Sequence, residues 1–257
     1  MAFCVRNGGF KLTFTNASFK VSDLQFLDNK LGNFTLYKVN EMFETIQGEG
    51  VFTGVPAVFV RLQECPVGCA WCDTKQTWDA EPADERSFDE ILVKTEDNPN
   101  WCSASAQQII ERYRTQGYSA KHIVITGGEP CIYDLVPLTQ AFEAIGCRCQ
   151  IETSGTFDVQ ATENTWVTVS PKVAMKGKLP IIDSALRRAN EIKHPVATDK
   201  DIDNLDQLLA RAKVPETTVI ALQPISQKPR ATQLCIETCI ARNWRLSIQT
   251  HKYLSIA

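Results

Sequence analysis

The chain has 257 residues, of which 44% are apolar, and a formal net charge of −3. This length accommodates one large domain or two small ones, and we expect one globular domain with an N-terminal addition. The small negative charge, without a dense block of Lys and Arg, argues against a protein that grips nucleic-acid phosphates, so no nucleic-acid partner is expected. No apolar stretch approaches the ~18 residues that cross a bilayer, so no membrane association is expected.

The cysteine content points to a reducing compartment. The sequence contains ten cysteines. Its first residues, MAFCVR, lack the uninterrupted apolar segment and the small-residue cleavage site of a secretory signal. Because disulfides are rare where thiols are kept reduced, we predict a cytoplasmic protein with free cysteines.

The first motif along the chain is a glycine-containing loop. Residues 1–36, which precede it, show two predicted strand segments, 10–15 and 18–21, and are assigned no chemistry. Within 41–53, Gly48 and Gly50 flank Gln47 and Glu49. Glycine lets a backbone approach a ligand closely, and an amide with a carboxylate can read the hydrogen-bonding edge of a heterocycle. On composition alone, an ordinary glycine-rich turn is the favoured interpretation.

Arg61 interrupts the apolar strand predicted over 57–62. An unpaired guanidinium is costly to bury, so this side chain needs an anionic partner. That partner is either a structural carboxylate or the carboxylate of a ligand, which arginine can clamp with two hydrogen bonds.

Three cysteines follow this strand in one C-x3-C-x2-C loop, Cys65, Cys69 and Cys72. Structural zinc takes four protein ligands, whereas a 4Fe-4S cluster held by three cysteines keeps one iron free for another ligand. Gly68 permits a sharp bend in this loop, and Trp71 is available to cover it. The spacing therefore favours a cluster over incidental buried cysteines. Thr74, just beyond the loop, is by itself a common turn or cap residue.

Strands and helices alternate through the rest of the chain. After a charged, irregular stretch at 75–103 with one short helix near 88–95, we expect helices at 105–116, 135–145, 203–212 and 233–242. We expect strands at 120–126, 149–153, 166–170, 191–193 and 219–223. Such alternation predicts a mostly parallel sheet, which collects ligands at the carboxyl ends of its strands. Polar residues follow several of these ends, in the segments 126–130, 152–154, 170–172 and 223–224. The remaining cysteines, including Cys235 and Cys239, are interpreted as packing residues.

These motifs carry a resemblance to known enzymes. The cysteine loop resembles the signature of the radical S-adenosylmethionine (SAM) enzymes, in which SAM chelates the free iron. Segments 42–50 (MFETIQGEG), 72–74 (CDT), 126–130 (TGGEP), 170–172 (SPK) and 249–253 (QTHKY) are similar to the 7-carboxy-7-deazaguanine synthase family. The similarity is nearly continuous from residue 37 onward. We therefore expect a radical SAM domain over 37–257 and an extension of unassigned role over 1–36.

The resemblance implies an α/β fold, a partial (β/α) barrel of the radical SAM type. It implies that the reduced cluster cleaves SAM, and that the resulting 5′-deoxyadenosyl radical abstracts hydrogen from 6-carboxy-5,6,7,8-tetrahydropterin. Ring contraction with loss of ammonia then gives 7-carboxy-7-deazaguanine, a step toward queuosine. A homodimer and a flavodoxin-like electron donor are expected by the same analogy. No side chain is predicted to be catalytic, since the cofactor carries the chemistry.

The resemblance also implies the residues of the site. The cluster would be held by Cys65, Cys69 and Cys72, and a Mg²⁺ ion by Thr74. SAM would be contacted by Trp71, Cys72, Asp73, Gly128, Ser170, Pro171 and Lys172. The substrate would be contacted by Ile46, Gln47, Gly48, Glu49, Arg61, Thr126 and Gln223. His251 and Lys252 are either part of the anion site or a solvated tail.

Two other functions share parts of this pattern. A radical SAM enzyme that activates a glycyl-radical protein would share the cysteine loop and the glycines, but it needs a groove for a peptide. Gln47, Glu49, Arg61 and Thr74 fit a small polar anion better, and a dependence of turnover on Mg²⁺ would separate the two. A zinc-stabilised binding module would contain zinc without iron, and the absence of a fourth ligand in the loop argues against it.

Overall fold

A computed structural model of the protein describes residues 35–254. The predicted extension and its two strand segments lie outside the described residues, except for Thr35 and Leu36. No helix within 35–254 has the length and apolar character needed to span a membrane.

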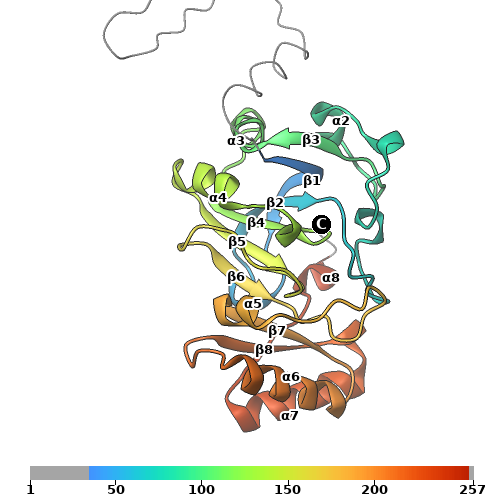
Figure 1. Cartoon of the computed structure of the whole chain (residues 1–257), viewed down its shortest axis with the longest axis vertical. Helices are drawn as coiled ribbons and strands as arrows, with labels where there is room; N and C mark the ends of the chain where they lie inside the picture. Colours follow the sequence, from blue (N-terminus) through green and yellow to red (C-terminus); the bar gives the residue numbers. More distant parts are fainter. Residues whose placement is uncertain (1–34, 255–257) are drawn as a thin grey trace, which may run out of the picture. The chain divides into compact units, whose positions relative to one another are not determined.

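The described residues form one nine-stranded sheet, in the spatial order β3-β1-β2-β4-β5-β6-β7-β8-β9 (Figure 1). The strands are β1 (Leu36–Ile46), β2 (Pro56–Leu62), β3 (Cys102–Ser105), β4 (His122–Gly127), β5 (Arg148–Thr153), β6 (Trp166–Val169), β7 (Glu191–Val196), β8 (Val219–Pro224) and β9 (Arg245–Leu246). β1 runs antiparallel to β2 and β3, and every other neighbouring pair is parallel. The sheet has edges at β3 and β9 and does not close. This confirms the predicted α/β class with a mostly parallel sheet, and the open sheet is compatible with a partial barrel.

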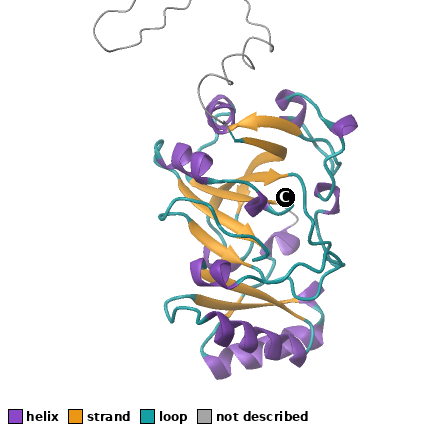
Figure 2. Ribbon diagram, in the orientation of Figure 1, coloured by secondary structure: helices purple, strands orange, loops and turns teal. Residues whose placement is uncertain are grey.

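The helices are α2 (Phe88–Leu92), α3 (Ala106–Thr115), α4 (Val136–Glu143), α5 (Asp183–Arg188), α6 (Asp199–Ala212), α7 (Pro229–Arg242) and α8 (Thr250–Leu254). Helices α3 to α7 follow the sheet along one side, and α8 lies on the cavity side (Figure 2). α3 begins as predicted, because the Ser105 side chain accepts from the N–H of Gln108 and the Gln108 side chain accepts from the N–H of Ser105. α6 and α7 begin four residues earlier than predicted. A capping box at Thr198 opens α6 and Pro229 occupies the first turn of α7.

Strand alternation gives the sheet an apolar face and a polar face. On the helix side, Val60, Ile125 and Ile151 are fully buried in one core with Leu138 and Phe142 of α4. A second core lies under α5, α6 and α7. The residues between these apolar positions point to the opposite face, and there the strands carry polar side chains that line a cavity.

Candidate active site

A cavity of about 330 Å³ lies at the carboxyl ends of the parallel strands. It is lined by the loop after β2, by the glycines that end β4, by the ends of β5 and β8, and by the loop that joins β1 to β2. Every predicted site residue except Pro171 lines this cavity; Pro171 is buried beside it. The strand ends therefore meet at one cavity, to which segments far apart in the sequence contribute.

The three cysteines sit on a tight loop that directly follows β2. Gly68 has φ +68°, a conformation that favours glycine, and the Cys72 N–H donates to the Cys69 carbonyl at 3.2 Å. A segment at 174–178 packs against this loop, because the Gly177 N–H donates to the Val67 carbonyl at 2.9 Å. The loop thus has a fixed backbone, and all three thiols line the cavity.

The sulfur atoms have surroundings that suit iron. The Cys72 sulfur accepts two N–H groups, from the backbone of Thr74 and from the indole of Trp78, each at 3.4 Å. Hydrogen bonds to cluster sulfurs tune the reduction potential. Burial raises the pKa of Cys65 to about 11 and also raises that of Cys69, so iron binding by thiolates must release protons. Within residues 35–254, no three His, Cys, Asp or Glu side chains gather as ligands of a single metal ion. The donor set of three separate thiols fits a 4Fe-4S cluster, in which each thiolate binds a different iron.

The glycines that end β4 allow it to approach β2 very closely. A Cβ atom at Gly127 would lie 2.3 Å from the backbone N and O of Leu62, and one at Gly128 would lie 2.1 Å from the carbonyl oxygen of Glu64. Glycine is therefore required at both positions for packing, a reason that the sequence did not reveal. Both glycines also line the cavity.

Glu129, next in the chain, is a buried carboxylate with four donors. It accepts from the N–H groups of Cys131 at 3.0 Å and Ser154 at 2.8 Å, and from the hydroxyls of Thr153 at 2.5 Å and Ser154. These bonds tie the end of β4 to the end of β5. Glu129 therefore holds two parts of the cavity wall in register, a role that sequence reasoning missed.

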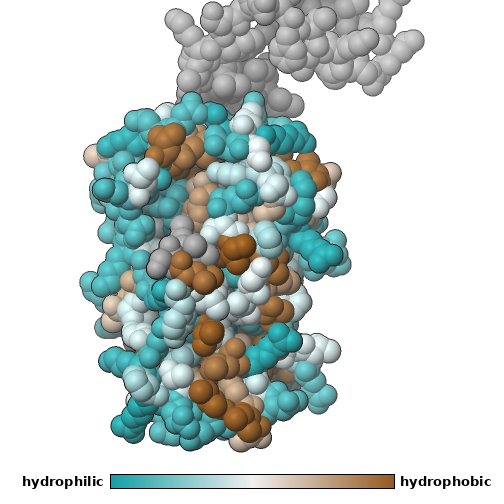
Figure 3. Space-filling model, turned by 180° about the vertical axis from the view of Figure 1, so that it is seen from behind, coloured by the Kyte–Doolittle hydropathy of each residue, from teal (hydrophilic) through white to brown (hydrophobic). Residues whose placement is uncertain are grey.

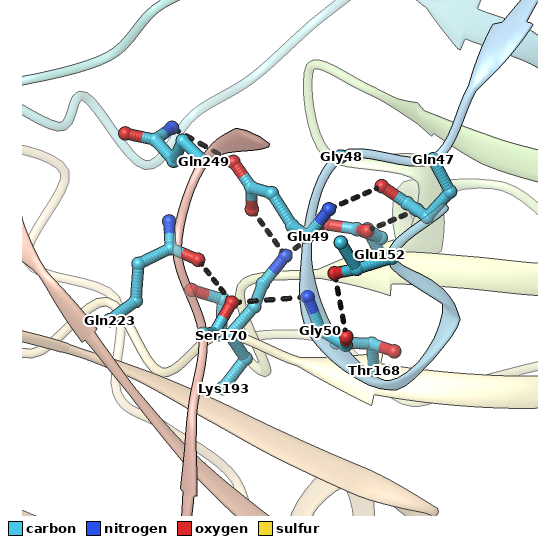
Figure 4. A network of polar contacts seen from close by, with 12 residues as sticks. Gln47, Gly48, Glu49, Gly50, Glu152, Thr168, Ser170, Lys193, Gln223 and Gln249 are labelled. Atoms are coloured by element: carbon cyan, nitrogen blue, oxygen red, sulfur yellow. Dashed lines mark hydrogen bonds and ion pairs between the residues drawn. The ribbon is translucent and has the colours of Figure 1, made fainter. Parts of the chain in front are cut away.

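The floor of the cavity is a polar network around the glycine-containing loop (Figure 4). Gln47 donates to Glu152 at 3.0 Å, and its own side-chain oxygen accepts from the N–H of Glu49 at 3.1 Å. Lys193, from β7, donates to Glu49 at 2.5 Å and to Glu152 at 2.8 Å. Burial disfavours the charge on Glu49, but Lys193 outweighs it and lowers the pKa of this carboxyl group.

Lys193 was not predicted. The sequence does contain a signal for it, because Lys193 is a charged residue in the apolar-containing strand EIKHPV. In a strand, Lys193 lies on the same face as Glu191 and on the opposite face from Ile192. Burial opposes its charge, yet the two carboxylates raise its pKa above the usual value.

Arg61 is paired with a carboxylate of the protein. Its Nε donates to Glu41 of β1, and the guanidinium lies 5.9 Å from the centre of the Phe43 ring. Of the two predicted partners, the structure thus contains the structural carboxylate. Arg61 nevertheless lines the cavity, so its remaining N–H groups are placed to meet a ligand.

The C-terminal segment joins the floor to the cysteine loop. Thr250 donates from its N–H and its hydroxyl to the Gly48 carbonyl, both at 2.9 Å. Gln249 donates to Glu49 at 2.8 Å and to Asp73 at 3.3 Å, and Lys252 pairs with Asp73 at 3.2 Å. Of the two interpretations of this segment, the structure favours a part of the site, since Gln249, His251 and Lys252 line the cavity.

The remaining predicted residues line other parts of the cavity. Lys172 donates to the Ser170 hydroxyl at 2.9 Å, and burial lowers the pKa of its ammonium group. Gln223 accepts from the hydroxyl of Ser247 at 2.9 Å, which in turn accepts from the Gly50 N–H at 3.0 Å. The Thr74 hydroxyl lies 3.5 Å from the Gly127 carbonyl, at the border between the cysteine loop and β4.

Comparison with known proteins agrees with this arrangement. A family model described as "4Fe-4S single cluster domain" matches residues 46–173. The chain is 62% identical to a 7-carboxy-7-deazaguanine synthase from Escherichia coli over 86% of its own length and 99% of that protein. It is 47% identical to a 7-carboxy-7-deazaguanine synthase from Buchnera aphidicola over the same shares of the two chains.

A solved structure shares the fold. The crystal structure titled QueE from Escherichia coli superimposes with a TM-score of 0.82 at 56% identity, covering 90% of this chain and 99% of that one. An identity of 62% over 99% of a relative establishes membership of the same family. The three-thiol loop and the polar floor line one cavity, in agreement with this assignment. This chain belongs to the 7-carboxy-7-deazaguanine synthase family.

Proposed function

We propose that this protein converts 6-carboxy-5,6,7,8-tetrahydropterin to 7-carboxy-7-deazaguanine with loss of ammonia, as a radical SAM lyase in queuosine biosynthesis. The observation that carries the proposal is the single cavity in which a loop of three thiols faces a floor of Gln47, Glu49, Glu152 and Lys193, in a chain 62% identical to a synthase of this name. The cavity is small and its floor is polar, which suits a pterin carboxylate rather than a peptide.

The cofactors are a 4Fe-4S cluster and SAM, which together supply the 5′-deoxyadenosyl radical. Cys65, Cys69 and Cys72 would hold the cluster. The two N–H groups that reach the Cys72 sulfur would stabilise its thiolate, and the backbone of Gly127 and Gly128 would accept from the ammonium of SAM. The wall with Ser170, Pro171 and Lys172 and the loop residues Trp71, Cys72 and Asp73 would complete the SAM site. Pro171 acts there through the position it gives to its neighbours.

The substrate would lie above the floor. Ile46, Gln47, Gly48 and Glu49 would read its pyrimidine ring, while Thr126 and Gln223 flank it from β4 and β8. Arg61 would bind the substrate carboxylate with the N–H groups that Glu41 does not use. Thr74 would hold a Mg²⁺ ion, which would supply positive charge for the substrate carboxylate.

The partners extend this proposal. The substrate is a small molecule; a flavodoxin-like protein would supply the electron, and the chain would act as a homodimer. A subunit contact is supported by exposed apolar side chains, among them Ile240 of α7 and Leu246 of β9. Figure 3 shows a brown area in the lower part of the molecule. A cytoplasmic location is supported by the nine free cysteines within 35–254.

One experiment tests the function. Anaerobically reconstituted, reduced protein is incubated with SAM, 6-carboxy-5,6,7,8-tetrahydropterin and Mg²⁺, and the products are separated. We expect 7-carboxy-7-deazaguanine and ammonia in equal amounts, formed only when SAM is present. Because the substrate and these two products balance without any gain or loss of hydrogen, 5′-deoxyadenosine is not a stoichiometric product. Formation of 5′-deoxyadenosine without the deazapurine would contradict the proposal and would favour a radical SAM enzyme with another substrate.

A further inference from the structure

Lys193 lines the cavity and lies between two carboxylates from separate elements. Its Nζ atom lies 2.5 Å from Glu49, in the loop between β1 and β2, and 2.8 Å from Glu152, on β5. The Lys193 side chain is 3% exposed, whereas those of Glu49 and Glu152 are 16% and 19% exposed. The ammonium group is therefore more shielded from solvent than the two carboxylates, and all three side chains line the cavity.

The second oxygen of each carboxylate is held by amide groups. Gln249 donates to Oε1 of Glu49 at 2.8 Å, and Gln47 donates to Oε1 of Glu152 at 3.0 Å. An ionised carboxylate offers about four lone-pair sites and no proton. The protein groups bonded to Glu49 and Glu152 are all donors. They do not fill all the lone-pair sites of either carboxylate, so each can accept a further hydrogen bond from a ligand in the cavity.

Removing the ammonium group would change the chemistry of this floor. Two carboxylates that share a poorly solvated site without a cation cannot both ionise, so they share a proton. The floor would then present a donor where it now presents acceptors.

We propose that Lys193 is a positioning residue that sets the specificity of the floor, by keeping Glu49 and Glu152 both ionised as acceptors for adjacent N–H groups of the substrate. The inference rests on the proposed function, because a 2-amino-4-oxopyrimidine ring presents an N–H and an NH₂ side by side. A site built from such acceptors rejects a ring without the amino group, since a buried carboxylate oxygen would be left without a partner.

Other charged groups face this trio and are part of its balance. Lys172 interacts with Glu49 and Glu152, and Glu191 interacts with Lys193 from the same strand. His251 interacts with Glu49 from the C-terminal segment. None of these groups pairs with both Glu49 and Glu152 as Lys193 does. Their charges change the local potential, but they do not take the place of the Lys193 ammonium group.

The test compares cluster-loaded Lys193→Met with the wild type under anaerobic conditions. The readout is the ratio of dissociation constants for 7-carboxy-7-deazaguanine and its analogue without the 2-amino group, measured by calorimetry. We expect the wild type to prefer the amino compound by about 100-fold and Lys193→Met to lose at least about tenfold of this preference. The KM for the pterin should rise by a similar factor at pH 7.5 and fall again toward pH 9, as the shared proton leaves.

A double variant separates charge from packing. In Lys193→Met with Glu152→Gln, the second carboxylate is gone, so Glu49 ionises again and the preference should recover by about tenfold over Lys193→Met alone. A purely structural role of Lys193 predicts no recovery. Lys121→Met is the matched control, since Lys121 is exposed, lies outside the cavity and bonds to Tyr113.

The outcomes are distinct. An unchanged preference in Lys193→Met, or losses that simply add in the double variant, would overturn the inference while leaving the proposed function intact. A wild type that makes no deazapurine would instead overturn the proposed function. If Lys193→Met fails to load its cluster, Lys193→Gln, which is also uncharged but polar, is measured in the same way and decides the question.

Discussion

Gly177 holds the segment 174–178 against the cysteine loop, and replacing it with alanine should loosen the cluster. A Cβ atom at this position would lie 2.0 Å from the Pro66 carbonyl oxygen and 3.0 Å from that of Val67. A carbon and a carbonyl oxygen approach no closer than about 3.3 Å in ordinary contacts, so the two segments must separate by roughly 1 Å. Backbone atoms cannot rotate away as a side chain would.

The cost follows from two terms. Overpacking a tight contact costs about 1–3 kcal/mol, and the hydrogen bond from Gly177 to Val67 contributes about 1 kcal/mol more. A total of about 2–4 kcal/mol makes opening of the segment at least about tenfold more frequent. The assay is the rate at which an iron chelator removes iron from the anaerobic protein, and Gly177→Ala should lose iron at least about tenfold faster than the wild type.

Gly146→Ala is the control for this prediction. Gly146 has φ +79° and open space around its missing Cβ, so alanine there costs only backbone strain of about 1 kcal/mol. It lies between α4 and β5, at the amino end of the parallel strands. Equal rates of iron loss from Gly177→Ala, Gly146→Ala and the wild type would refute the reasoning.

Three further predictions concern the wall, the core and the metal. Glu129→Gln replaces an acceptor of four hydrogen bonds with an amide that also donates, so the free energy of unfolding should fall by about 2–4 kcal/mol in chemical denaturation; a loss under 1 kcal/mol would contradict this. Burial lowers the pKa of His194 from 6.5 to about 4, so unfolding takes up a proton and stability is lost as the pH falls through this window. Between pH 7.5 and 5.5, His194 lowers the free energy of unfolding by about 1 kcal/mol. In urea unfolding, the free energy of His194→Gln should therefore fall by about 1 kcal/mol less than that of the wild type over the same pH range. An equal fall in both proteins would contradict this. Thr74→Val removes the proposed Mg²⁺ ligand, so half-maximal turnover should need at least about tenfold more Mg²⁺; an unchanged Mg²⁺ titration would count against a role for this hydroxyl.

The parts of the site that local sequence encodes were predictable. Three cysteines in one loop and glycines at a strand end are motifs of a few residues, and parallel strands bring their carboxyl ends together regardless of the distance between them in the sequence. The cavity therefore contains nearly all the predicted residues.

The missed parts depend on partners far apart in the chain. Lys193 pairs with Glu49 and Glu152, which are 144 and 41 residues away. The sequence around a charged residue in a short strand does not indicate such distant partners. β1 was missed for a different reason. Its pairing with β2 shifts register between Val39 and Glu41, so its side chains do not alternate regularly enough to predict a strand.

The alternatives for Arg61 show the same limit. Burial of its guanidinium demanded an anion, and that much could be inferred from the strand sequence. Whether the anion is a ligand or Glu41 depends on the antiparallel pairing of β1 with β2, which places Glu41 directly opposite Arg61. Only the three-dimensional structure supplies that pairing.

The central claim is that three cysteines hold a 4Fe-4S cluster whose fourth iron is left for SAM. Mössbauer spectroscopy of ⁵⁷Fe-loaded, anaerobic protein, recorded before and after addition of SAM, tests it most directly. The account predicts that one iron in four changes its isomer shift and quadrupole splitting when SAM is added, while the other three keep theirs. Spectra that do not change with SAM would contradict it.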